Sequence, residues 1–164
     1  MQSIYLVGFM GSGKSNVAVA LHQKLNKQLL DTDQMIVDTY GLTIPEIFQQ
    51  KGEEIFREYE TSVLKQTPIK EAIIATGGGI IEKAENREWL KENGKVIFLK
   101  TSWEEINRRL VDDQSRPIWN NQDRDKQQLL VERTPKYLEV ADLIVETDGK
   151  DVHSIIEEIA DKLG

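Results

Sequence analysis

The stretch that decides the fold is Gly8-Phe9-Met10-Gly11-Ser12-Gly13-Lys14-Ser15. It matches the phosphate-loop pattern G-x-x-x-x-G-K-[ST] at every fixed position. Glycines in this pattern let successive backbone N–H groups point inward at phosphate oxygens, and the following helix adds its positive end. Lys14 is expected to reach the β- and γ-phosphates, and the Ser15 hydroxyl is expected to ligate Mg²⁺.

The flanks of this loop support the same interpretation. The apolar run Ile4–Val7 precedes it directly, and Val17, Leu21 and Leu25 follow it at helical spacing. A glycine-rich turn without a ligand is the alternative, and a strand-loop-helix context argues against it. We therefore predict a nucleotide site, although the loop does not say which acceptor takes the phosphoryl group.

Short apolar runs alternate with helical patterns along the rest of the chain. Helices are predicted from Lys14 and from two capping boxes, Thr43 with Glu46 and Ser102 with Glu105. This alternation predicts an α/β fold with a five-stranded parallel sheet between two helical layers, and ligands at the carboxyl ends of its strands. The predicted strands are hydrophobic almost throughout, which is typical of strands covered on both faces: Ser3–Val7, Gln28–Leu30, Ala72–Ala75, Lys95–Leu99 and Asp142–Val145.

Composition bounds the class of protein. The 164 residues suit one domain spanning 1–164. The net charge of −7, without a cationic stripe, argues against a nucleic-acid partner, and no apolar stretch approaches the length of a membrane span. The absence of cysteine excludes disulfides and thiolate sites. We expect a cytoplasmic protein that contacts neither nucleic acid nor membrane.

Two acids follow the second predicted strand, Asp31 and Asp33. A phosphoryl-transfer enzyme needs a carboxylate near Mg²⁺ and another that orients the acceptor hydroxyl or accepts its proton. Capping of the helix near Gln34 is the alternative role for one of them. The nearby phosphate loop favours a functional role.

Other candidate residues lie further along the chain. Gly77, Gly78 and Gly79 follow the strand Ala72–Ala75, where a close approach of substrate to the backbone is favoured over a flexible turn. For each arginine, the residue pattern alone indicates a surface position or salt bridge. Two arginines together would nevertheless suit a carboxylate substrate, and one on a mobile segment would suit a phosphoryl group in transfer.

At this point the motifs coincide with a known set, and the chain resembles the shikimate kinases from Ile4 to about Val145. The resemblance rests on GFMGSGKS, DTD, GLTIPEIFQQKGEEIFREYE, ATGGGI, SRP and ERTPKYLEVAD, in that order. GEEIFREYE followed by GGG is its most specific part. It implies a nucleoside-monophosphate-kinase-like fold, the transfer of phosphoryl from ATP to shikimate in aromatic amino-acid biosynthesis, and Mg²⁺ as cofactor. We also expect a monomer.

The resemblance also implies residue roles. Ser15 and Asp31 would hold Mg²⁺, and Lys14, Asp33 and Arg116 would be catalytic. Shikimate would be bound in a helical segment of about residues 33–61, with a lid at about residues 112–125. Shikimate would contact Asp33, Arg57, Gly77, Gly78, Gly79 and Arg133, and ATP would contact Gly11, Ser12, Gly13, Lys14, Ser15, Asn16, Arg109 and Arg116.

Rival functions remain open at this stage. A gluconate or nucleotide kinase would share the scaffold with a different acceptor. A non-catalytic nucleotide-binding domain would predict damaged catalytic positions, whereas Lys14, Asp31, Asp33 and Arg116 are intact. A GTPase is disfavoured because there is no Asn-Lys-x-Asp segment.

Overall fold

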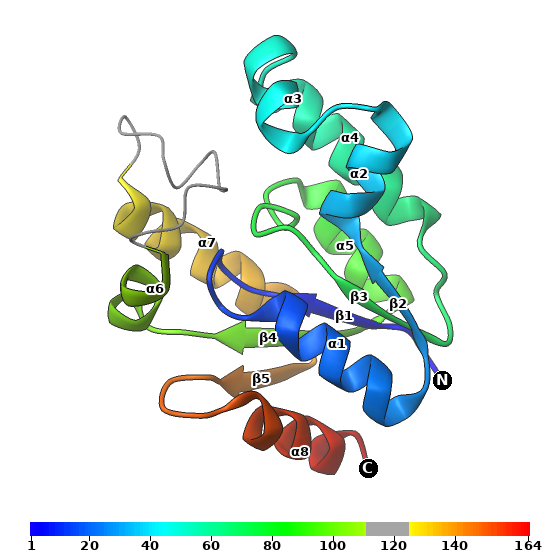
Figure 1. Ribbon diagram of the computed structural model, residues 1–164, viewed down its shortest axis with the longest axis vertical. Coiled ribbons are helices and arrows are strands. Elements are labelled where there is room, and N and C mark those ends of the chain that lie inside the picture. The colour runs from blue at the N-terminus through cyan, green and yellow to red at the C-terminus, as the bar shows by residue number, and fades with distance from the viewer. Residues whose placement is uncertain (111–124) are drawn as a thin grey trace.

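The computed structural model describes residues 1–110 and 125–164. Within them the strands form one parallel sheet in the order β2-β3-β1-β4-β5 (Figure 1). The strands are β1 (Ile4–Val7), β2 (Gln28–Asp31), β3 (Ala72–Ala75), β4 (Lys95–Lys100) and β5 (Leu143–Glu146). The predicted five-stranded parallel sheet is confirmed, and its strand ends differ from the sequence prediction by at most one residue.

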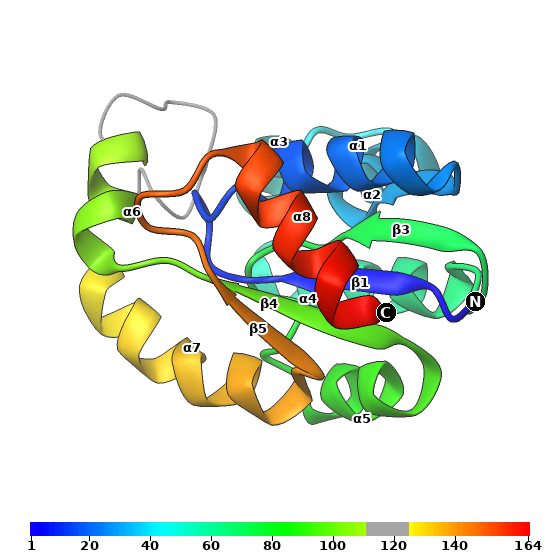
Figure 2. The same ribbon diagram turned by 90° about the horizontal axis from the view of Figure 1, so that it is seen from below.

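Helices cover both faces of the sheet. Figure 2 shows α1 and α8 on one side and α5 and α7 on the other. Side chains of β1 alternate between these layers: Ile4 and Leu6 pack with α1 and α8, whereas Tyr5 and Val7 pack with α5 and α7. The helices are α1 (Lys14–Leu25), α2 (Thr32–Tyr40), α3 (Ile44–Gln50), α4 (Glu53–Gln66), α5 (Ala84–Asn93), α6 (Trp103–Leu110), α7 (Lys126–Val140) and α8 (Val152–Leu163).

Burial differs between the centre and the edges of the sheet. β1 and β3 are buried throughout, as predicted. The prediction is wrong for the edge strands β2 and β5, where Leu29 and Leu30 are half-buried and Ile144 is 43% exposed. An edge strand has a neighbour on one side only, so its hydrophobic residues are covered less completely.

The helices α2, α3 and α4 pack around a separate apolar cluster beyond one edge of the sheet (Figure 1). Its buried members are Ile36, Ile47, Phe56 and Val63. The predicted capping box begins α3, because Thr43 accepts from the Glu46 N–H at 3.3 Å while Glu46 accepts from the Thr43 N–H at 3.0 Å. These helices therefore form a unit beside the sheet that carries its own core.

Parallel register brings three strand ends to one edge of the sheet. Asp31 of β2 pairs with Ala75 of β3, which pairs with Leu6 of β1. The segments that follow these strands therefore lie side by side: the phosphate loop, the start of α2 and the glycine run. No helix within residues 1–110 and 125–164 has the length and apolar composition needed to cross a membrane.

Candidate active site

The phosphate loop adopts a conformation that requires glycine. Gly13 has φ of 92° and ends the loop immediately before α1. The N-cap residue Gly13 has no side chain to cap this helix, which leaves its first N–H groups suited to an anion. At Gly8 a Cβ would stand 2.7 Å from the Leu99 carbonyl oxygen, so the loop packs tightly against the end of β4.

Lys14 folds back over its own loop. Its buried Nζ donates to the carbonyl oxygens of Gly8 at 2.6 Å and Phe9 at 3.0 Å. Next to it, Ser12 is buried and its Oγ has no hydrogen-bond partner among the described residues. Ser15 and Asn16 are exposed at the start of α1. The loop thus presents an ammonium group, a hydroxyl and backbone donors around one space.

A cavity of about 640 Å³ lies over this loop. Its lining joins Gly11–Asn16 to Asp31 and Asp33, and to Gly77 and Gly78 of the glycine run. It therefore brings together the predicted phosphate, acid and glycine segments. Arg57, Gly79 and Arg133 are not among its lining residues; the Arg57 guanidinium lies against Gly79, and that of Arg133 lies beside Gly78. Arg116 and residues 112–124 of the predicted lid fall outside the described residues, whereas Asp125 caps α7.

The cavity extends to a segment that the sequence prediction missed. Arg109 lies at its side, where its Nη1 donates to the Gly11 carbonyl oxygen at 2.8 Å and its Nε to Glu105 at 2.9 Å. The lining also includes Lys150 and Asp151, between β5 and α8, and Val152 at the start of α8. No sequence motif marks this loop, because its place in the site depends on the fold alone.

Asp31 caps the helix that carries Asp33. Asp31 Oδ1 accepts from the backbone N–H of Asp33 at 2.9 Å and of Gln34 at 3.3 Å, so the alternative role of helix capping is confirmed for Asp31. Asp31 also lines the cavity, so capping does not remove it from the site. Asp33 lies one residue into α2 and lines the same cavity.

A buried acid that the sequence prediction missed lies behind Asp33. Glu60 is 1% exposed, and its Oε2 has no hydrogen-bond partner among the described residues. Burial raises the pKa of this carboxyl to about 7, although the Arg57 guanidinium acts in the opposite direction. Its position three residues after Arg57 on a helix is the sequence signal that could have indicated the pair.

Each glycine of the run makes room for a different neighbour. A Cβ on Gly77 would stand 2.8 Å from Asp33 Oδ1 and 2.9 Å from Glu60 Oε2. On Gly78 it would stand 3.3 Å from the Met10 nitrogen, and on Gly79 2.2 Å from Arg57 Nη1. The run is therefore a packed junction, and the alternative of a flexible turn does not describe it.

Arg57 is buried, contrary to the default expectation of a surface salt bridge. It is 8% exposed and lies on α4, where Nη1 donates to Glu60 at 2.9 Å and Nη2 to Glu53 at 3.2 Å. Each Nη carries a second hydrogen beyond these bonds. The ion pairs hold the guanidinium against Gly79.

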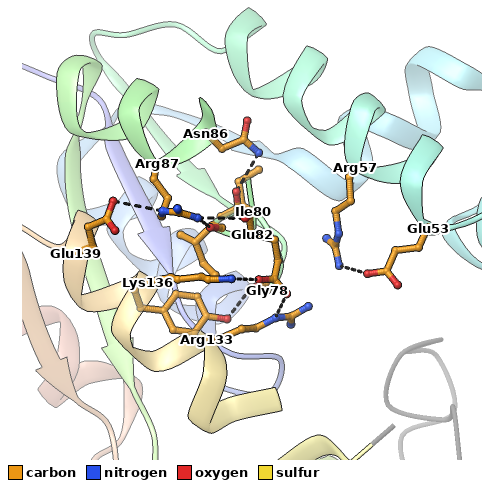
Figure 3. A network of polar contacts seen from close by, with 12 residues as sticks. Glu53, Arg57, Gly78, Ile80, Glu82, Asn86, Arg87, Arg133, Lys136 and Glu139 are labelled. Carbon is orange, nitrogen blue, oxygen red and sulfur yellow. Dashed lines mark hydrogen bonds and ion pairs between the residues drawn. The ribbon is translucent and has the colours of Figure 1, made fainter. Parts of the chain in front are cut away.

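Arg133 is also buried, at 0% exposure, where the sequence pattern alone indicated a surface arginine. Its Nε donates to Glu82 Oε2 at 3.1 Å, and its guanidinium lies 5.8 Å from the centre of the Phe9 ring. Neither Nη1 nor Nη2 has a hydrogen-bond partner among the described residues. In Figure 3 the guanidinium extends past Glu82 toward the side on which Arg57 lies. A buried, half-bonded guanidinium is costly, so this group is suited to an incoming anion.

Comparison with known proteins agrees with this geometry. The family model described as shikimate kinase matches residues 10–164. A shikimate kinase from Bacillus cereus is 42% identical over 163 residues, which cover 99% of each chain. A solved shikimate kinase from Acinetobacter baumannii, in complex with shikimate, is 38% identical with a TM-score of 0.94, covering 99% of this chain and 93% of that one. The shikimate kinase from Aquifex aeolicus is 35% identical with a TM-score of 0.83, covering 98% of this chain and 95% of that one. A phosphate loop and an acid pair line one cavity here, and the family model and the relatives match almost the whole chain, so the chain belongs to the shikimate kinase family.

Proposed function

We propose that this protein transfers the γ-phosphoryl group of ATP to a hydroxyl of shikimate. The observation that carries this proposal is the pairing of a nucleotide-type cavity with a buried Arg133 whose Nη atoms have no described partner. The first feature suits a phosphoryl donor, and the second suits a small acceptor that carries a carboxylate. The family membership points to the same reaction.

At the donor end, the phosphates lie on the phosphate loop and the N-terminus of α1. Lys14 exchanges its contacts with the Gly8 and Phe9 carbonyls for phosphate oxygens, because an ammonium group binds an anion more strongly than a neutral carbonyl. The base lies toward Arg109 and Lys150–Val152, at the far end of the cavity. In this placement the nucleotide extends from the phosphate loop to Arg109 and Lys150–Val152.

At the acceptor end, Asp33 orients the reacting hydroxyl and accepts its proton. Its place at the first turn of α2 directs the carboxylate toward the phosphate loop across the cavity. The shikimate carboxylate lies between Arg133 and Arg57, whose guanidinium groups meet consecutive glycines of the run. The two ends of the acceptor are thus held by groups of opposite charge, which fixes its direction.

The donor set near the loop fits Mg²⁺. Ser15 and Asp31 line the cavity and offer hard oxygen atoms, and Mg²⁺ takes few protein ligands together with phosphate oxygens. No cluster of three or more His, Cys, Asp or Glu side chains suited to a metal occurs in the described part of the chain, which agrees with a site completed by the nucleotide. Bound there, Mg²⁺ would neutralise phosphate charge. The lid, the role of Arg116 and the monomeric state stay predictions.

The test is ADP release with Mg-ATP, measured with shikimate, gluconate, nucleoside monophosphates and no acceptor. Turnover with shikimate alone is the expected result. Turnover with gluconate or a nucleoside monophosphate instead would assign a different acceptor to the same scaffold. No turnover with any acceptor, together with measurable ATP binding, would support a non-catalytic nucleotide-binding domain.

A further inference from the structure

Glu82 lies where the glycine run meets α7, and the functions described above do not use it. Its Oε2 accepts from Arg133 Nε at 3.1 Å, and its Oε1 accepts from Lys136 Nζ at 2.8 Å (Figure 3). Burial acts to raise the pKa of the half-buried Glu82 carboxyl, but Lys136 and Arg133 together lower this pKa below its ordinary value, so Glu82 is ionised at neutral pH. One carboxylate thus joins two cations of α7 to the segment after the glycine run.

Glu82 binds one edge of the Arg133 guanidinium and leaves the other edge for a ligand. A guanidinium can bind a carboxylate through its two Nη atoms or through Nε and one Nη. Glu82 takes the Nε position, and Nη1 and Nη2 remain without described partners. Nη1 lies 3.6 Å from the position of a Cβ on Gly78, which places it beside the glycine run. The bond to Glu82 therefore leaves one defined edge for a ligand.

We propose that Glu82 is a positioning residue that aims Arg133 at the carboxylate of the acceptor. This inference rests on the proposed function, because it names how that site recognises its anion. Arg133 has a long, flexible side chain that is fully buried, and its Nε needs an acceptor in that environment. Removing Glu82 frees the guanidinium to rotate and offer the wrong edge.

An opposing effect also follows from the charge of Glu82. Its loss makes the surroundings of Arg133 more positive, which attracts an anion. Lys136 already offsets this charge, and the Glu82 side chain is 24% exposed, so solvent weakens its field at the ligand. No described group replaces the hydrogen bond from Arg133 Nε to Glu82. We therefore expect the loss of orientation to outweigh the gain in positive charge, so that affinity for the anion falls.

The test compares Glu82→Ala with Glu82→Gln, because glutamine retains an oxygen that can accept from Arg133 Nε. Alanine should raise the KM for shikimate about tenfold, and glutamine should restore it to within about threefold of the unsubstituted protein. The KM for ATP and kcat should change by less than about twofold, because the carboxylate is held equally in the ground and transition states.

Glu139→Gln is the matched control. Glu139 lies on α7 and also accepts from two cations, Arg87 and Lys91, both at 3.2 Å, but neither of these cations belongs to the proposed acceptor site. Its substitution should leave every kinetic constant unchanged. An unchanged or lower KM for shikimate in Glu82→Ala would overturn the inference. So would an equal rise for both substrates, or a glutamine variant as impaired as the alanine variant.

Arg133→Lys separates this inference from the proposed function. Lysine keeps the charge and loses the fork of donors, so the KM for shikimate should rise. Turnover of shikimate that depends on Arg133 but not on Glu82 would refute the positioning role alone. A protein that neither phosphorylates shikimate nor binds it by calorimetry would refute both.

Discussion

Replacing Gly79 by alanine should weaken acceptor binding, because the added methyl group would displace the guanidinium of Arg57. The φ of Gly79 lies outside the left-handed region, so the backbone accepts alanine without strain. The new Cβ, however, would stand 2.2 Å from Arg57 Nη1 and 2.5 Å from its Cζ. Ordinary contact begins at 3.4 Å, so the guanidinium must retreat by about 1.2 Å.

The expected loss of stability and of acceptor affinity follows from this displacement of the Arg57 guanidinium. It disrupts the bond from Arg57 to Glu60, now 2.9 Å long, and moves the guanidinium from its place in the site. Overpacking of this kind costs about 1–3 kcal/mol of stability. A lost hydrogen bond between charged groups costs about 1.5–3 kcal/mol of binding, which corresponds to at least a roughly tenfold rise in the KM for shikimate.

Steady-state kinetics with each substrate varied in turn measures this, alongside thermal unfolding. The KM for ATP should stay within about twofold of its original value, because Arg57 and Gly79 do not line the cavity over the phosphate loop. Gly41→Ala is the control: its φ of 73° makes alanine strained, but apart from its chain neighbours no described residue has a heavy atom within 4 Å of the new Cβ. It should lose stability without changing either KM. An unchanged KM for shikimate in a folded Gly79→Ala protein would refute the placement of Arg57 at the acceptor.

Lys14→Ala should lower turnover by orders of magnitude without unfolding the protein, because the Nζ bonds to the Gly8 and Phe9 carbonyls stay within one loop and join no two elements of the core; kinetics and circular dichroism measure the two effects. Glu60→Gln should flatten the dependence of stability on pH in urea unfolding between pH 5 and 8. The native pKa of about 7 lies above the ordinary 4.5, so the stability from this proton is complete below pH 4.5 and is lost as the pH rises through 7, on the order of 3 kcal/mol. Tyr137→Phe should cost about 1–2 kcal/mol in the same assay, because it leaves the Gly78 carbonyl without the donor that now lies 2.5 Å away.

Much of the fold could be predicted because local and global signals agree in this chain. The glycine pattern of the phosphate loop fixes a strand before it and a helix after it, and the structure has β1 and α1 at those places. The capping box at Thr43 specifies the start of α3 by hydrogen bonds within four residues. Such signals need no knowledge of the tertiary structure. The edge positions of β2 and β5 depend on strand order, which no local pattern encodes.

The candidate site was predictable in its residue types but not in its burial. Arg57 and Arg133 lie in polar segments whose composition indicates an exposed surface, yet both side chains are buried. Their burial arises because α4 and α7 meet the glycine run from different parts of the chain. Glu60 and Glu82 were missed for the same reason: each becomes informative only through the arginine that it contacts.

The incompletely bonded guanidinium of Arg133 has a consequence for the protein without ligands. A buried charge with two nitrogen atoms that lack a partner among the described residues makes the ligand-free fold less stable than an apolar side chain of similar size would. Arg133→Met should therefore match or exceed the original melting temperature while losing affinity for shikimate. Conversely, shikimate alone should raise the melting temperature of the unsubstituted protein but not that of the methionine variant. Selection for thermostability alone would thus tend to remove this arginine, and its retention is a trade-off between stability and recognition.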